Sequence, residues 1–226
     1  MECWVYVDGF NLYNGALERW HAKWLDLRQL SQTLRPHDHI GRIKYFTALV
    51  EYRPSDPDQQ ARQRTYWRAL ATVGVDIIPG SFRRRPRMMP LVDSVDLIET
   101  LDRNGTNVLD TKPAMSRVYR SEEKQSDVSL AAHMIHDAHR SGAGNTFELA
   151  LLISSDTDFT EAVRIVTQEI GKKVVVCKPD SRAYCAALSA VATATRDLTE
   201  RTCRACRLPD PVVDAQGNHI AKPSSW

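Results

Sequence analysis

Apolar, β-branched runs alternate along the chain with amphipathic stretches, and this alternation restricts the fold more than any other feature. Short apolar runs bounded by turn residues predict strands, and apolar residues at three- and four-residue spacing predict helices. The expected strands are Cys3–Val7, Ile43–Val50, Val75–Pro79, Leu149–Ser154 and Lys173–Cys177. Because helices separate successive strands, we predict an α/β fold with a mostly parallel central sheet.

Helical patterns lie between and after these strands. Their expected ranges are Asn11–His21, Asp26–Leu34, Asp58–Val73, about Glu122–Arg140, Thr160–Ile170 and Ser181–Val191. Gly74, Gly142 and Gly171 stand just past three of them, where a left-handed C-cap is expected.

The composition is ordinary for a globular protein, with 42% hydrophobic and 26% charged residues. The net charge of +2 is too small to indicate a polyanionic partner, so such a partner must be argued from local clusters. No apolar run approaches the roughly 18–20 residues of a membrane span, and the N-terminus MECWVYVDGF lacks the pattern of a signal peptide. Five irregularly spaced cysteines suit reduced thiols, so we expect a cytoplasmic protein.

The segment from about residue 80 to 121 interrupts the alternation. It begins with the basic run SFRRRPR and later contains Asn104-Gly105, a pair typical of a tight hairpin turn. We therefore expect an insertion that projects from a domain of residues 1–200. Residues 201–226 are rich in proline and polar residues towards their end, and we expect an extended tail that packs on the domain.

Two of the expected strands end in acidic residues. Asp8 follows Val5–Val7, and Asp156 and Asp158 follow Leu149–Ser154. In open parallel sheets, ligands bind outside the carboxyl ends of the strands, where the strand order reverses. If the order is 3-2-1-4-5, these two strands are neighbours and the three carboxylates converge in one crevice.

Asp127 lies near the start of the Glu122–Arg140 helix, which leads into the strand at Leu149. If helix and strand are antiparallel, we expect the helix start at the opposite end of the sheet from the other acids. Asp127 then joins them only if the helix bends past the rim of the sheet.

Taken singly, these acids have structural explanations. An aspartate at a strand end most often caps a turn or helix, and Asp158 with Glu161 has the spacing of a capping box. Three or four carboxylates in one crevice, however, stay ionised only beside a cation. Oxygen donors without histidine or cysteine suit Mg²⁺ or Mn²⁺, and such an ion supports phosphodiester hydrolysis.

Three ordered motifs resemble the NYN domain of the PIN-like ribonuclease superfamily. They are VDGFNLY at Val7–Tyr13, EEKQSDV at Glu122–Val128 and SSDTDF at Ser154–Phe159. The resemblance covers about residues 3–195 and is strongest to the LabA/DUF88-like branch, whose tail the ending also resembles. The chain departs from the family at Gln125-Ser126 and Ser155, and its insertion is longer than usual.

The resemblance implies a PIN-like three-layer α/β/α sandwich and a Mg²⁺- or Mn²⁺-dependent ribonuclease. Position by position, Asp8, Asp127, Asp156 and Asp158 match the acidic metal site, and Asn11 matches a residue that orients a ligand or water. The implied reaction is in-line attack by a metal-activated water on RNA, which we expect to be single-stranded, leaving a 5′-phosphate and a 3′-hydroxyl. Asp8 and Asp156 are expected as the main ligands, and Asp127 and Asp158 through water or a second ion.

Basic residues outside the acidic motifs are candidates for RNA contact. They are Lys124 and the cluster Arg83, Arg84, Arg85 and Arg87, which could neutralise several phosphates. The alternative is a solvated surface, as for many arginine runs. A homodimer that uses the insertion or the tail stays open.

Other interpretations of the sequence are weaker. A catalytically inactive RNA-binding or partner-docking module would retain the same fold. A phosphatase with an aspartate nucleophile requires a second aspartate at the position of Phe10. Cys203-x-x-Cys206 is typical of zinc sites, but only His219 offers a further ligand nearby. His133, His136 and His139 recur every three residues, which favours a partly exposed stripe on the helix.

Overall fold

The computed structural model describes residues 1–101, 106–140, 142, 145–183 and 185–226, without the side chains of 82–85, 92–93, 95–101, 107–110 and 119–124. The chain forms two compact units. The first contains Met1–Ser81 and Glu123–Trp226, and the second contains Phe82–Glu122. The expected turn at Asn104-Gly105 lies outside the described residues. Within them, no helix has the length and apolar character needed to span a membrane.

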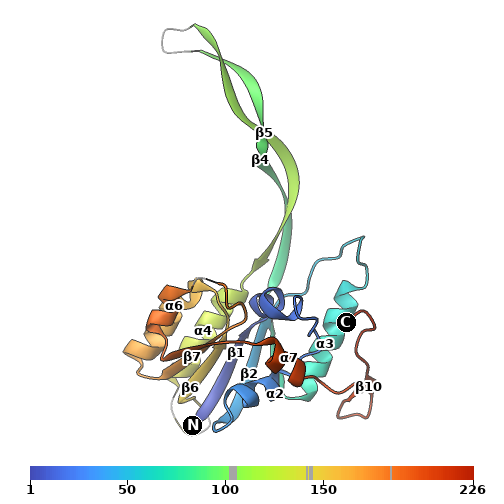
Figure 1. The fold of residues 1–226 in the computed structure, drawn as a ribbon, viewed down its shortest axis with the longest axis vertical. Helices are drawn as coiled ribbons and strands as arrows, with labels where there is room; N and C mark the ends of the chain where they lie inside the picture. The colour runs from blue at the N-terminus through green and yellow to red at the C-terminus, as the bar shows by residue number, and fades with distance from the viewer. Residues whose placement is uncertain (102–105, 141, 143–144, 184) are drawn as a thin grey trace. The chain divides into compact units, whose positions relative to one another are not determined.

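The first unit is built on a six-stranded parallel sheet (Figure 1). Its order is β3 (Val75–Pro79), β2 (His39–Thr47), β1 (Glu2–Asp8), β6 (Leu149–Ile153), β7 (Lys173–Lys178) and β8 (Ala194–Asp197). The predicted order 3-2-1-4-5 is confirmed for the first five strands. The order reverses between the neighbours β1 and β6, which is the switch point at which parallel sheets bind ligands.

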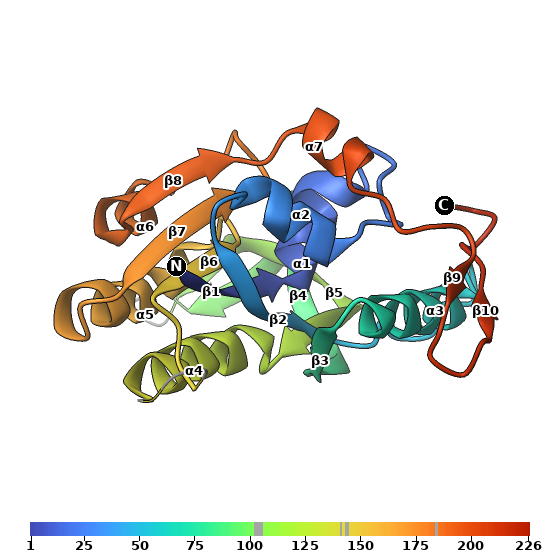
Figure 2. The ribbon, with the colours of Figure 1, turned by 90° about the horizontal axis from the view of Figure 1, so that it is seen from below.

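Both faces of the sheet are covered, as alternate residues of β1 show. Cys3, Val5 and Val7 point into one core, and Trp4 and Tyr6 point into the other. The helices of the first core are α1 (Gly9–Leu12), α2 (Leu27–Leu34), α3 (Gln59–Thr72) and α7 (Glu200–Ala205), with the π-helical turn η1 (Tyr13–Leu17). Those of the second are α4 (Ser126–His139), α5 (Thr160–Arg164) and α6 (Ala186–Val191), with the π-helical turn η3 (Ile165–Glu169) (Figure 2). The predicted three-layer α/β/α sandwich is therefore confirmed.

Buried charges fix α4 to the sheet. Lys44 Nζ on β2 donates to Asp137 Oδ2 at 2.5 Å, and Tyr6 Oη donates to the same oxygen at 2.8 Å. His133, one turn before Asp137, lies 3.2 Å from Lys44 Nζ and is half-buried, whereas His136 and His139 are exposed. Since both side chains that bond the Asp137 carboxylate, Lys44 on β2 and Tyr6 on β1, come from the sheet, these bonds fix the position of α4 along it.

Residues after β8 return to the first core. Cys203 and Cys206 are buried free thiols there, and Cys206 Sγ lies 3.4 Å from Thr33 Oγ1. A short antiparallel hairpin, β9 (Val212–Val213) and β10 (His219–Ile220), contacts α3. Trp226 packs on Tyr66 with ring centroids 5.8 Å apart.

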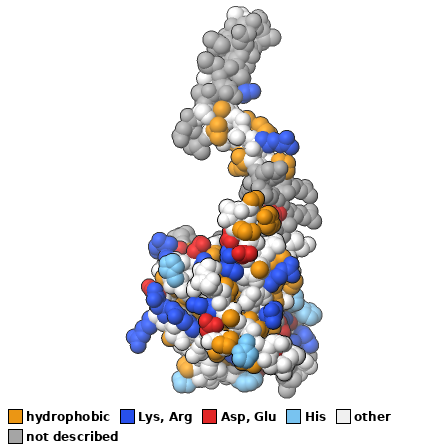
Figure 3. All heavy atoms as spheres, turned by 90° about the vertical axis from the view of Figure 1, so that its right-hand side faces the viewer, with side chains coloured by type: hydrophobic (Ala, Val, Ile, Leu, Met, Phe, Trp, Pro, Cys, Tyr) orange, Lys and Arg blue, Asp and Glu red, His pale blue; other side chains and the backbone are white. Residues whose placement is uncertain are grey.

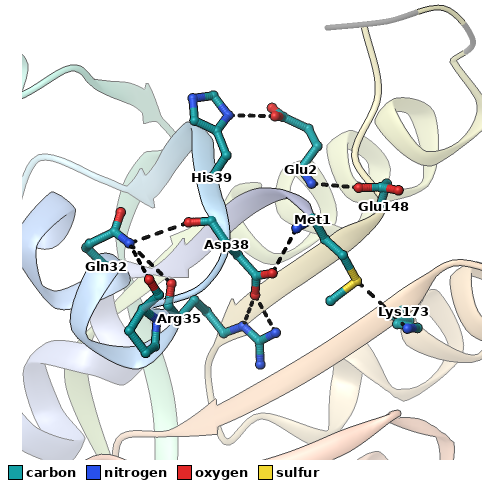
Figure 4. Close-up of polar contacts among 9 residues, drawn as sticks. Met1, Glu2, Gln32, Arg35, Asp38, His39, Glu148 and Lys173 are labelled. Atoms are coloured by element: carbon teal, nitrogen blue, oxygen red, sulfur yellow. Dashed lines mark hydrogen bonds and ion pairs between the residues drawn. The ribbon is translucent and has the colours of Figure 1, made fainter.

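Ion pairs secure the amino ends of the strands (Figure 4). Asp38 is buried and accepts hydrogen bonds from the N-terminal ammonium at 3.0 Å and from Arg35 Nε at 2.6 Å. Burial alone would raise the pKa of Asp38, but these hydrogen bonds hold it below its ordinary value. His39 Nδ1 lies 2.7 Å from Glu2 Oε2 beside them. Asp38 at this edge is thus matched by two cations, the N-terminal ammonium and Arg35.

The second unit contains most of two long strands that pair with each other, β4 (Ser81–Leu101) and β5 (Asn107–Lys124). Exposed apolar side chains stand among basic ones on it (Figure 3). The described apolar ones are Met88, Met89, Leu91, Met115 and Val118.

Candidate functional site

A pocket of about 410 Å³ opens at the carboxyl ends of β1 and β6. Its wall contains three of the four predicted site carboxylates, Asp8, Asp127 and Asp156, together with Asn11. The other lining residues are Phe10, Asn14, Gly15, Ser155, Asp180 and Ala183. Asp158 is not among them.

Asp8 is the last residue of β1 and the N-cap of α1. Its Oδ1 accepts a hydrogen bond from the Asn11 amide at 3.0 Å, and its Oδ2 accepts one from Ser154 Oγ at 2.9 Å. The residue is only 6% exposed. Burial raises the pKa of Asp8 to about 6, helped by the charges of Asp127 and Asp156 and opposed by the two hydrogen bonds.

Gly9 follows Asp8 because a larger residue has no space there. A Cβ at this position would lie 2.7 Å from the Phe46 carbonyl oxygen and 2.8 Å from Tyr45 Cζ. The close approach lets α1 begin directly at the end of β1, which points Asp8 into the pocket.

Hydrogen bonds join the first acidic motif to the third. Ser154 Oγ, which donates to Asp8, accepts from the Asp156 amide at 3.0 Å. Asn11 Oδ1 accepts from the Ser155 amide at 2.9 Å. We expected Asn11 to orient a ligand or water; in the structure its side-chain oxygen positions the backbone that carries Asp156.

Asp156, rather than Asp158, caps the chain after β6. Asp156 Oδ1 accepts from the Asp158 amide at 3.0 Å at the start of a 3₁₀ turn, Thr157–Phe159. The predicted capping box of Asp158 and Glu161 is wrong, because α5 begins after Phe159 without a side-chain cap and Glu161 pairs with Arg164. Asp158 itself is exposed.

Asp127 lies in the first turn of α4, which starts at Ser126 because residues 122–124 still belong to β5. The expectation that this helix start lies at the opposite end of the sheet is wrong. A helix antiparallel to the strand that follows it begins at that strand's carboxyl end, so no bend is required. Although Asp127 is exposed, partial desolvation and the charges of Asp156 and Asp158 raise its pKa.

The donor set fits a hydrated divalent cation. Among the residues that the structure describes, no three histidine, cysteine, aspartate or glutamate side chains are close enough to enclose a metal ion by themselves. Mg²⁺ and Mn²⁺ keep several waters and need only one or two carboxylates, so full enclosure is not required. The charges that raise the pKa of Asp8 and Asp127 belong to neighbouring carboxylates, and a cation would relieve that repulsion.

Ser154 and Asp180 are among the polar residues of the site that the sequence prediction missed. Asp180 follows β7, so the rule that identified Asp8 and Asp156 applies equally to the sequence VVVCKPD. Hydrogen bonds from Arg182 lower the pKa of Asp180 to about 2. Ser154 precedes the acids in the third motif, but nothing in its spacing indicated a bond to Asp8.

The other predicted site residues are the basic candidates for RNA contact. The side chains of Arg83, Arg84, Arg85 and Lys124 lie outside the described residues, and Arg87 is exposed on β4 of the second unit. Phe10 lines the pocket where an aspartate-nucleophile phosphatase would require its second acid.

Comparison with known proteins agrees with this architecture. The chain is 28% identical over 197 residues to 6-hydroxy-3-succinoylpyridine 3-monooxygenase HspA of Pseudomonas putida (strain DSM 28022 / S16). The match covers 78% of this chain and 59% of that enzyme, so the chain spans about three fifths of its relative. A protein of unknown function from Vibrio parahaemolyticus RIMD 2210633, VPA0982, has a similar fold, with a TM-score of 0.51 and 18% identity over 88% of this chain and 93% of its own.

The NYN domain, which belongs to the PIN-like nuclease superfamily, matches residues 2–196. Domains of that superfamily generally use divalent metals, and NYN nucleases generally act on RNA. Since the match extends over nearly the whole chain and its three motifs line one pocket, this protein belongs to the NYN domain family.

Proposed function

We propose that this protein is a ribonuclease of the LabA/DUF88-like branch that hydrolyses phosphodiester bonds of single-stranded RNA with Mg²⁺ or Mn²⁺. One observation carries the proposal. Asp8, Asp127 and Asp156 come from three separate elements and line one pocket at the switch point of the sheet. Burial is the main cause of the raised pKa values of Asp8 and Asp127, and the charges of neighbouring carboxylates raise them further, so a cation is favoured as their partner.

The four acidic residues have different roles according to their positions. Asp8 and Asp156 hold the ion, because Ser154 and Asn11 fix both relative to each other. Asp127 at the pocket wall and Asp158 outside it act through water or a second ion. Such an ion supplies a Lewis acid that lowers the pKa of water and neutralises charge on a phosphoryl oxygen.

The substrate class rests on the surroundings of the acids. The half-buried Phe10 at the pocket wall suits contact with an unpaired base, which favours a single strand. We further propose that Arg83, Arg84, Arg85, Arg87 and Lys124 contact RNA phosphates. Exposed apolar residues of the second unit, such as Met88 and Met115, support a homodimer through the inserted segment.

Cleavage of labelled single-stranded RNA in Mg²⁺, Mn²⁺ or EDTA tests the function. Wild type should cut in either metal and not in EDTA, whereas Asp8→Asn and Asp156→Asn should lose activity by at least about a hundredfold. Asp76→Asn, which removes an exposed carboxylate of β3, is the matched control and should cut normally. Intact RNA with wild type in both metals refutes the proposal, and retained RNA binding would then favour an inactive binding module.

A second candidate is the oxygenation named for the Pseudomonas putida relative. The 28% identity favours it, although 59% coverage leaves much of that enzyme without a counterpart here. Oxygen uptake with 6-hydroxy-3-succinoylpyridine and a reduced nicotinamide distinguishes the two functions. Uptake that depends on both compounds would support the oxygenase, and its absence alongside RNA cleavage would reject it.

A further inference from the structure

Asp180 differs from the other carboxylates of the pocket because two arginines hold it. Arg182 donates two hydrogen bonds to its carboxylate, from Nε to Oδ1 at 3.0 Å and from Nη2 to Oδ2 at 3.2 Å. The Arg182 amide also donates to Oδ1 at 3.0 Å. Arg19 approaches from the chain after β1, with Nη1 at 3.4 Å from the same oxygen. The local charge at Asp180 is therefore positive.

The two guanidiniums remain accessible while held. The side chains of Arg182 and Arg19 are 75% and 33% exposed, whereas that of Asp180 is 26% exposed and lines the pocket. An arginine has five N–H donors, and Asp180 engages two from Arg182 and one from Arg19. Arg19 also stacks over the Trp20 ring at 4.8 Å, which limits its rotation.

The backbone ties this group to the acidic motifs. The Asp180 amide lies 3.5 Å from Ser155 Oγ, and Pro179 packs against Gly15, which also lines the pocket. Asp180 thus lines the same pocket as Asp8 and Asp156, but its two arginine partners make the local charge around it positive. The carboxylates of Asp8 and Asp156 favour a cation in the pocket, and the arginines beside Asp180 favour an anion next to it.

We propose that Arg19 and Arg182, positioned by Asp180, bind the phosphate adjacent to the one that is cleaved. The inference rests on the proposed function and narrows its substrate to a polynucleotide, because a mononucleotide has no second phosphate for the arginines. Planar guanidinium groups suit phosphate oxygens, and prior fixation by Asp180 reduces the conformational entropy lost on binding. Asp180 is a positioning residue, and the arginines are binding residues.

The test measures binding of a short labelled single-stranded RNA in EDTA over a series of salt concentrations. Arg182→Ala and Arg19→Ala should each weaken binding about tenfold and reduce the magnitude of the log–log salt slope by about 0.7. Arg204→Ala, which removes an exposed arginine paired with Glu200 on α7, is the matched control and should bind as wild type does. Thermal unfolding verifies that every variant is folded.

Asp180→Asn separates positioning from metal binding. If Asp180 positions Arg19 and Arg182 as an arginine clamp for phosphate, Asp180→Asn should bind RNA more weakly. The Mn²⁺ concentration that it needs for half-maximal cleavage should be unchanged. An increased Mn²⁺ requirement with unchanged RNA binding would overturn it, as would arginine variants that bind like Arg204→Ala. RNA binding that depends on both arginines, without cleavage in any metal, would instead refute the nuclease function and leave the clamp intact.

Discussion

Replacing Asp8 with asparagine should stabilise the metal-free protein at neutral pH. Asp8 is 6% exposed, and burial raises the pKa of its carboxyl group from 3.8 to about 6. A raised pKa in the folded state means that folding disfavours the anion. The stability contributed by the protonated group is therefore fully present below the unfolded pKa and is lost as the pH rises from about 4 to about 6.

The size of the effect follows from the shift. About two pKa units at about 1.4 kcal/mol each give a ceiling of about 3 kcal/mol above the folded pKa. Asparagine keeps an oxygen for the Asn11 amide and can donate to Ser154 Oγ, but neutral hydrogen bonds are weaker than those to a carboxylate, by about 1 kcal/mol. The expected net gain for Asp8→Asn is thus about 2 kcal/mol.

Urea unfolding in EDTA, followed across a pH series from about 4 to about 8, measures this gain. Wild type should lose stability relative to Asp8→Asn between about pH 4 and about pH 6 and little above that, and the control Asp76→Asn should behave like wild type. Saturating Mn²⁺ should then stabilise wild type by mass action and not Asp8→Asn. A variant less stable than wild type above about pH 6 in EDTA, or parallel pH profiles, would refute the reasoning.

Three further changes probe the scaffold. Gly9→Ala places a Cβ 2.7 Å from the Phe46 carbonyl oxygen, so urea unfolding should show a loss of about 1–3 kcal/mol; a loss below about 0.5 would mean that the backbone can yield. Lys44→Met leaves the buried Asp137 carboxylate without its cation and should cost about 3–5 kcal/mol by the same measurement, whereas a neutral result would show that Asp137 is not charged there. Ser154→Ala removes a hydrogen bond that lowers the pKa of Asp8, so carboxyl NMR titration should place that pKa above about 6, and an unchanged value would contradict the network.

The sheet and two of its acids were predictable because the signals are local. Residues of β6 are all buried and apolar, so the strand and the acid that ends it stand out in the sequence. The same applies to β1, and once the two strands are neighbours the convergence of Asp8 and Asp156 follows from geometry.

The errors have equally specific causes. Strand β8 reads ATRD and is exposed at every position, so no apolar run marks it. The arginine-rich start of β4, SFRRRPR, lacks the apolar run that marks a strand in the sequence. Asp127 was misplaced because its helix was expected to start at the wrong end of the sheet. A helix antiparallel to the strand that follows it begins at that strand's carboxyl end. The bond between Ser154 and Asp8 joins residues 146 positions apart, a contact that only the folded chain reveals.

Anomalous diffraction from crystals soaked in Mn²⁺ tests the central claim most directly. The account predicts a manganese peak in the pocket, with Asp8 and Asp156 as ligands and Asp127 in contact directly or through water. In Asp8→Asn crystals the peak should weaken or vanish. An empty pocket in wild-type crystals at saturating Mn²⁺ would contradict a metal-dependent nuclease site here. A manganese peak found only elsewhere, such as at His219 in the tail, would contradict it equally.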